Sequence, residues 1–200
     1  MSAAGHVTRA ELAGTVLGWT ARGAHPLVVG NGFLSREVMA AGDGDHVLYL
    51  LAGMGLAPAV AAGLSLARGV RAVALEGDGN HLMGLPGTAT IGLTGVRLTH
   101  VVHWNGGWES TGGQRVFGPG RVHDIGRAFG YATTEVVTEA ATLGAALDRS
   151  AAADGPALVH VVGAMGDPVP PRTGLTMPGV ARRFQVWLRS AEGDPERAVQ

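Results

Sequence analysis

The sequence predicts an α/β fold of three layers, in which a mostly parallel sheet carries helices on both faces. Short apolar runs rich in β-branched residues are typical of buried strands, and they cover residues 26–30, 46–51, 71–76, 98–104, 131–137 and 157–162. Segments with helical spacing lie between these runs, at residues 9–22, 35–41, 56–68, 82–93, 123–129 and 139–153. This alternation of strand and helix favours a parallel sheet covered on both sides.

We expect residues 1–200 to form a single domain. A chain of 200 residues with 46% hydrophobic content is large enough for one packed core. The stretch 163–179 is rich in proline and glycine, and we interpret it as an extended crossing that delivers a last helix, residues 180–190, to the body. We find no internal repeat and no boundary of a second domain.

The composition excludes several classes of chemistry. The formal net charge is −1 and basic residues form no run, which argues against binding to nucleic acid or to a membrane surface. The sequence has no cysteine, which excludes disulfides and thiolate metal sites, and no lysine, which excludes Schiff-base catalysis and a P-loop lysine. The N-terminus does not follow the pattern of a signal peptide, so we expect a soluble cytoplasmic protein.

One region imitates a dinucleotide-binding motif. The predicted strand at residues 46–51 is followed by Gly53-Met54-Gly55, an alanine-rich helix, a second strand and an acid at Glu76. The third small position of that motif falls on Pro58, however, and a separate glycine-flanked acid follows Glu76. We therefore do not favour a nicotinamide cofactor.

That second acid, Asp78, lies between Gly77 and Gly79 at the end of a predicted strand. Glycine lets the backbone approach a ligand closely, and a helix start presents free N–H groups to an anion such as diphosphate. Diphosphate is commonly bound with Mg²⁺, which takes oxygen ligands. Asn105 ends the next strand along, 105 − 78 = 27 residues later. Alone, Asp78 could be a helix cap and Asn105 a turn residue, but together they predict a metal–diphosphate site.

This motif resembles the metal and diphosphate motif of the thiamine diphosphate (ThDP) enzymes. The resemblance covers nearly the whole chain, through the runs VTRAELA, NGFLSRE, AGMGLAPAVAAGLSLA, GDGNHLMGLPGTATIG, LTHVVHWNGGWESTGGQ and PRTG…MPGVARRFQVWL. These runs look like the diphosphate-binding (PP) domain of the phosphonopyruvate and sulfopyruvate decarboxylases, with ESTGGQ as the most specific. The sequence departs from the family at His103-Trp104, where relatives usually have an aliphatic residue and Asp, and at Asn80, where many have Ser.

The resemblance implies a role for each matching position. Asp78 and Asn105 would bind Mg²⁺ through their side chains and Gly107 through its carbonyl, while Gly79 and Asn80 would meet the diphosphate through backbone N–H groups. Met54 would hold ThDP in its bent shape, and the backbone of residues 52–54 would hold the pyrimidine. The implied cofactor-binding residues are Ala52, Gly53, Met54, Gly77, Asp78, Gly79, Asn80, Asn105 and Gly107, and the catalytic candidates are Met54 and Glu109.

Several residues near the motif keep two interpretations. Ser110, Thr111 and Gln114 could contact substrate or could be only turn and cap residues. Glu109 could handle a proton, orient the loop or support the metal turn from behind.

Four histidines can also be assigned from their positions. His81 could approach a phosphate or face solvent. His100 and His103 should point to opposite faces of their strand and so cannot bind one metal together, while His160 should be a satisfied core residue.

The resemblance also implies a partner chain. In this family the cofactor is activated by a glutamate from a separate pyrimidine-binding (PYR) domain, and residues 1–200 are all accounted for by the PP domain. We therefore expect one subunit of a hetero-oligomer that decarboxylates a short anionic 2-oxo acid, phosphonopyruvate or sulfopyruvate, to CO₂ and an aldehyde. Two alternatives are a ThDP-dependent carboligase subunit of a biosynthetic pathway and a non-catalytic PP-domain partner.

Overall fold

The computed structural model describes residues 6–116 and 121–192, with the side chains of residues 191 and 192 left out. Its centre is a six-stranded sheet in which every neighbouring pair is parallel. The strand order is β2 (Val47–Tyr49), β1 (Leu27–Val29), β3 (Ala72–Gly77), β4 (Leu98–Trp104), β8 (Ala157–Val162) and β7 (Thr133–Val137). The central strands are almost wholly buried, as expected for a parallel sheet covered on both sides.

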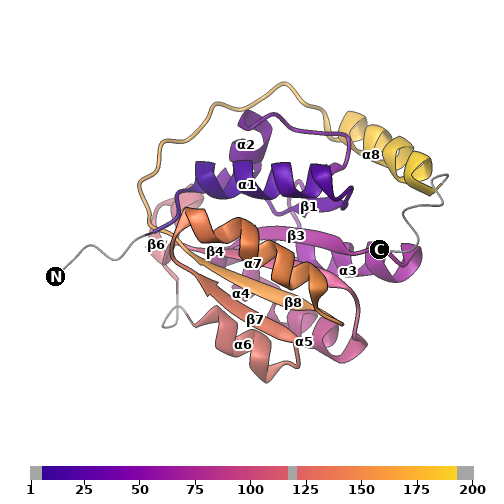
Figure 1. Cartoon of the computed structure of the whole chain (residues 1–200). Coiled ribbons are helices and arrows are strands. Elements are labelled where there is room, and N and C mark those ends of the chain that lie inside the picture. Colours follow the sequence, from indigo (N-terminus) through magenta and orange to yellow (C-terminus); the bar gives the residue numbers. More distant parts are fainter. Residues whose placement is uncertain (1–5, 117–120, 193–200) are drawn as a thin grey trace.

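Helices cover both faces of the sheet, as Figure 1 shows. One face carries α1 (Arg9–Arg22), α2 (Phe33–Ala40), α7 (Ala140–Ala152) and α8 (Met177–Glu192), whose apolar residues join one core cluster with the sheet. The other face carries α3 (Ala57–Arg68), α4 (Asp78–Met83), α5 (Leu85–Thr94) and α6 (Val122–Ala128), and residues of α3, α5 and α6 form a second cluster. The predicted three-layer α/β fold is confirmed.

The segment after β8 runs across the molecule without regular structure until α8 begins, as the proline-rich sequence predicted (Figure 1). α8 then packs beside β2 and starts at Met177, three residues before the predicted 180. Both guanidinium Nη atoms of Arg183 donate to the carboxylate of Asp43, at 2.6 Å each. This pair ties the end of the crossing to the edge of the sheet.

The predicted helix at residues 82–93 is wrong in its boundaries, because the structure has two helices there. α4 begins at Asp78 and ends at Met83, Gly84 caps it, and α5 starts at Leu85 with Pro86 in its first turn. A Cβ on Gly84 would lie 2.3 Å from the carbonyl oxygen of Gly55, so the two backbones touch at this break. Proline has no N–H to continue α4 and suits a first turn, so the chain restarts as a new helix.

The sequence also failed to predict a small unit after β4. It consists of β5 (Gly107–Trp108), the 3₁₀ turn η1 (Glu109–Thr111) and β6 (Gln114–Arg115), with β5 and β6 antiparallel. Within residues 6–116 and 121–192, no helix is long and apolar enough to cross a membrane.

Candidate functional site

The candidate site lies at the carboxyl ends of β3 and β4, where Gly77 pairs in register with His103. The two strands deliver Asp78 and Asn105 to one cavity of about 110 Å³. Its walls come from α1, the turn before α2, α4 and the β5–η1 unit, and its lining residues include Arg9, Asn31, Met54, Gly77, Asp78, Gly79, Asn80, Asn105, Gly107, Glu109, Ser110 and Thr111. Ligands are expected at this end of an open parallel sheet.

Asp78 is 3% exposed and its carboxylate accepts three backbone hydrogen bonds. Its Oδ1 accepts from the N–H of Gly79 at 2.7 Å, and its Oδ2 accepts from the N–H groups of Asn105 at 3.1 Å and Gly106 at 2.7 Å. Burial raises the pKa of the Asp78 carboxyl, although these N–H groups act in the opposite direction. The hydrogen bonds fix the carboxylate between the two strand ends.

Asn105 faces Asp78 from the turn after β4. Gly106 has a φ of +80°, a conformation that favours glycine, and it folds the turn back so that the N–H of Gly107 donates to Asn105 Oδ1 at 3.0 Å. The other end of the amide, Nδ2, donates to Glu109 Oε2 at 3.0 Å. Both ends of the Asn105 side chain therefore have a fixed partner.

The residues around the cavity fit a magnesium–diphosphate group. Asp78 and Asn105 each offer a side-chain oxygen at the cavity, and oxygen is the ligand type that Mg²⁺ prefers. Asn80 is buried and its Oδ1 has no hydrogen-bond partner, while its Nδ2 donates to the carbonyl of Asn31 at 2.8 Å. Buried polar atoms are normally satisfied, so this orphan oxygen is consistent with a polar group bound beside it.

Of residues 52–54, only Met54 lies at the cavity. Met54 lines the cavity and is partly buried, whereas Ala52 and Gly53 are exposed and lie outside its lining. Ala52 and Gly53 have φ angles of +62° and +63°, so this turn bends sharply after β2. The turn brings Met54 to the wall of the same cavity that Asp78 and Asn105 line.

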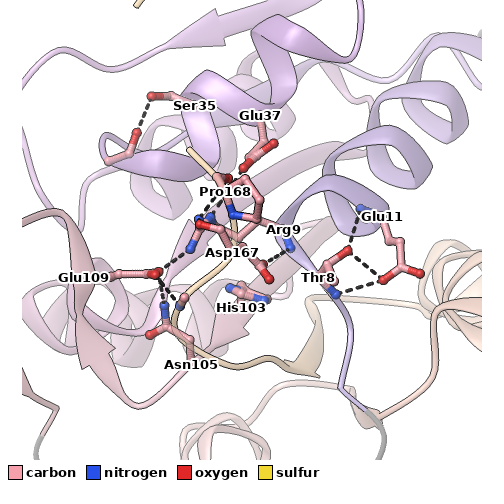
Figure 2. Close-up of polar contacts among 12 residues, drawn as sticks. Thr8, Arg9, Glu11, Ser35, Glu37, His103, Asn105, Glu109, Asp167 and Pro168 are labelled. Atoms are coloured by element: carbon pink, nitrogen blue, oxygen red, sulfur yellow. Dashed lines mark hydrogen bonds and ion pairs between the residues drawn. The ribbon is translucent and has the colours of Figure 1, made fainter. Parts of the chain in front are cut away.

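Of the three predicted substrate residues, two line the cavity and one does not. Ser110 and Thr111 line the cavity, but Gln114 is exposed in β6 and donates from Nε2 to the carbonyl of Thr111 at 3.0 Å. Glu109 lies in the cavity wall, where Oε1 accepts from the N–H of Gly166 at 2.7 Å. Its Oε2 pairs with Arg9, as Figure 2 shows.

The interpretation of His81 as facing solvent is wrong, because this side chain is fully buried, and it does not line the cavity. Its Nδ1 lies 3.5 Å from Oε1 of Glu76. Nε2 of His100 lies 2.9 Å from the same Glu76 oxygen. Burial disfavours the Glu76 carboxylate, but the two histidines outweigh it and hold the pKa of Glu76 below its usual range. Nδ1 of His100 in turn meets the hydroxyl of Tyr131 at 3.1 Å.

The other histidines mostly follow their predictions. His103 points to the face opposite His100, where its Nε2 bonds the carbonyl of Val7 at 3.1 Å, so the predicted opposition is confirmed. His160 is buried as predicted, but it is not fully satisfied, because its Nε2 has no partner and only Nδ1 meets His123.

Arg9 is a charged residue of the cavity wall that the sequence did not reveal. The Thr8–Glu11 capping box, visible in the sequence, starts α1 and puts Arg9 at its first position. Nothing in the sequence indicates that the guanidinium then reaches Glu109, which is 100 positions away.

The fold and this site define a domain that binds a diphosphate-bearing cofactor at the end of a parallel sheet. Residues 30–161 match the family model described as thiamine pyrophosphate enzyme, C-terminal TPP binding domain, where thiamine pyrophosphate is another name for ThDP. The chain therefore belongs to the thiamine pyrophosphate enzymes and contains their C-terminal cofactor-binding domain.

Two kinds of curated relative are similar to this chain. A phosphonopyruvate decarboxylase of Streptomyces viridochromogenes is 35% identical over 77% of this chain and 40% of its own length. The sulfopyruvate decarboxylase subunit beta of Methanothermobacter thermautotrophicus is 32% identical over 84% of this chain and 90% of its own length. The chain thus spans less than half of the first relative and nearly all of the second.

A solved structure supports the fold. The thiamine diphosphate-dependent 4-hydroxybenzoylformate decarboxylase of Rhodococcus jostii RHA1 superposes with a TM-score of 0.67 over 84% of this chain and 34% of its own, at 19% sequence identity. At this identity the similarity establishes the architecture alone.

Proposed function

We propose that this chain is the diphosphate- and Mg²⁺-binding subunit of a split, ThDP-dependent decarboxylase of a short anionic 2-oxo acid, of the phosphonopyruvate or sulfopyruvate type. The observation that carries the proposal is the pair of Asp78 and Asn105, held by fixed hydrogen bonds at one cavity in a chain of this family. The names of the two relatives supply the reaction class and the substrate class.

Each residue of the site has a distinct task in this proposal. Asp78, Asn105 and the carbonyl of Gly107 bind Mg²⁺, and the backbone of Gly79 and Asn80 receives the diphosphate. Met54, which lines the same cavity, supports the cofactor. The bound cofactor supplies the electron sink for loss of CO₂, while the protein supplies orientation and a shielded cavity.

A partner subunit with a PYR domain belongs to the proposal for two reasons. The chain covers 90% of a relative whose name is that of a beta subunit. Large apolar side chains are also exposed on the segments beside Met54 and at the end of α4, where Leu51 is 78%, Leu56 53% and Met83 54% exposed. Clustered exposed leucine and methionine side chains are typical of a surface that another chain covers.

The test is to co-express the chain with a candidate PYR-domain subunit and to purify the complex. With ThDP and Mg²⁺, the complex should release CO₂ from phosphonopyruvate or sulfopyruvate, and either subunit alone should not. The variant Asp78→Ala removes a metal ligand and should abolish turnover, with its assembly with the partner checked in parallel. A complex that binds ThDP but turns over no 2-oxo acid would refute the proposal, and a coupled product formed only with an added aldehyde would identify a carboligase instead.

A further inference from the structure

Arg9 is a buried cation that contacts three segments of the chain at the metal turn. Its side chain is 2% exposed and begins at the first position of α1. Nη1 pairs with Glu109, Nη2 donates to the carbonyl of Asp167 at 2.6 Å, and Nε lies 3.5 Å from Oε1 of Glu37 (Figure 2). The backbone N–H of Arg9 also donates to Oδ2 of Asp167, at 2.8 Å. The guanidinium is therefore held in one position.

Glu109 connects this cation to the metal turn. Its Oε2 accepts from both Arg9 and Nδ2 of Asn105, and its Oε1 accepts from the N–H of Gly166. Both oxygens are occupied, and three segments of the chain hold the carboxylate. Three donors, one of them a buried guanidinium, therefore hold this carboxylate in one orientation.

This contact decides how the Asn105 amide is oriented. An ionised carboxylate only accepts hydrogen bonds, so Glu109 can face the NH₂ end of the amide and repels its carbonyl end. Oδ1 must then point away from Glu109, toward the turn where the N–H of Gly107 donates to it. A carbonyl oxygen has two lone pairs, so Oδ1 keeps one for a cation.

We propose that Arg9 is a positioning residue which, acting through Glu109, sets the Asn105 side chain with its oxygen toward the metal. The proposal rests on the metal site of the proposed function. It assigns Glu109 to the support of a metal ligand. Interactions of this kind, one bond beyond the ligand, change metal affinity by about 10–100-fold.

The experiment measures Mn²⁺ binding by electron paramagnetic resonance, with ThDP in excess, on the full chain in complex with its partner subunit. Glu109→Leu fills similar space without an acceptor, so we expect its Mn²⁺ affinity to fall by about tenfold or more. Glu109→Gln keeps a carbonyl that can accept from Asn105, and it should recover part of the loss. Glu37→Gln removes a carboxylate from the same guanidinium without touching Asn105, and it should stay within about twofold of wild type.

Arg9 is tested as Arg9→Lys, because its removal would leave the Glu37 and Glu109 carboxylates without the cation they pair with. Lysine keeps the charge but cannot contact Glu109 and the Asp167 carbonyl together, so we expect a loss of about three- to tenfold in Mn²⁺ affinity. In the Glu109→Leu background the same change should add nothing, because the path to Asn105 is already broken.

The outcomes separate the two proposals. Wild-type protein that binds no Mn²⁺ with ThDP would overturn the proposed function and this inference together. Wild-type binding with unchanged affinity in Arg9→Lys and Glu109→Leu would overturn only the inference. Additive losses in the double variant would show that Arg9 acts by another route. Thermal unfolding of each variant, measured in parallel, ensures that affinities are compared among folded proteins.

Discussion

Replacing Asp78 with Asn tests whether this side chain is fixed by the backbone before any metal binds. The carboxylate accepts one N–H at Oδ1, from Gly79, and two at Oδ2, from Asn105 and Gly106. An amide offers only one acceptor, and its NH₂ end must face the remaining donors. The better orientation keeps the two bonds at the Oδ2 position and places NH₂ against the N–H of Gly79.

The magnitude follows from this loss. One hydrogen bond to a charged group contributes about 1.5–3 kcal/mol. Burial raises the pKa of Asp78, so the charged form carries a desolvation cost that the amide avoids, and the lower end of the range applies. We expect Asp78→Asn to lower the free energy of unfolding by about 1.5 kcal/mol without metal. For a chain of this size, that corresponds to a fall of about 3–6 °C in melting temperature.

The assay is thermal and urea unfolding of the metal-free chain, followed by Mn²⁺ titration with ThDP. Asp148→Asn is a matched control, because Asp148 Oδ1 accepts from Nε1 of Trp19 at 2.7 Å and an amide oxygen can keep that bond. The control should unfold within about 0.5 kcal/mol of wild type. Metal affinity should fall at least about tenfold in Asp78→Asn alone. An Asp78→Asn protein as stable as wild type, with unchanged Mn²⁺ affinity, would refute the geometry.

Two further substitutions probe the surroundings of the site. A Cβ on Gly79 would lie 2.9 Å from Cε3 of Trp108, so Gly79→Ala should lower the free energy of urea unfolding by about 1–3 kcal/mol. A Cβ on Gly77 meets open space, so the control Gly77→Ala should stay within about 0.5 kcal/mol of wild type. Equal losses in the two variants would contradict the packing. Burial, and then the charges of two neighbouring histidines, lower the pKa of His160 to about 4 from 6.5. The unfolded chain therefore takes up this proton first, and stability falls as the pH drops from about 6.5 to 4, by at most about 3 kcal/mol before solvent screening. His160→Gln should flatten the curve of unfolding free energy against pH in that window, and an unchanged curve would rule out this source.

The fold could be predicted because its signals are local. The strand 98–104 and the helix 9–22 have the observed boundaries, since buried parallel strands appear as continuous apolar runs and the capping box marks the helix start. The break between α4 and α5 has a local signal, Pro86 in the first turn of α5, which the prediction passed over. The contact between the backbones of Gly55 and Gly84 at this break was not visible, because the two residues are far apart in sequence.

The site, like the fold, has a part that local sequence signals predict and a part that they do not. Asp78 and Asn105 could be paired from the sequence because each follows a predicted strand and neighbouring strand ends meet at one edge of the sheet. The burial of His81 against Glu76 and His100 was not predictable, because α4 begins at Asp78 and turns the ring under the sheet end. The contact of Arg9 with Glu109 joins the first helix to the metal turn and depends wholly on the folded arrangement.

These contacts bear on how the site would bind the proposed metal. Neither Asp78 nor Asn105 depends on a cation for its position: backbone N–H groups hold the first and Glu109 holds the second. The conformational entropy of ordering both side chains is therefore lost when the chain folds, and little remains to be lost on binding. The two carboxylates differ in their charge partners. Glu109 is paired with the Arg9 cation, whereas Asp78 has only neutral N–H partners. Asp78 therefore keeps an uncompensated negative charge that a bound cation can neutralise.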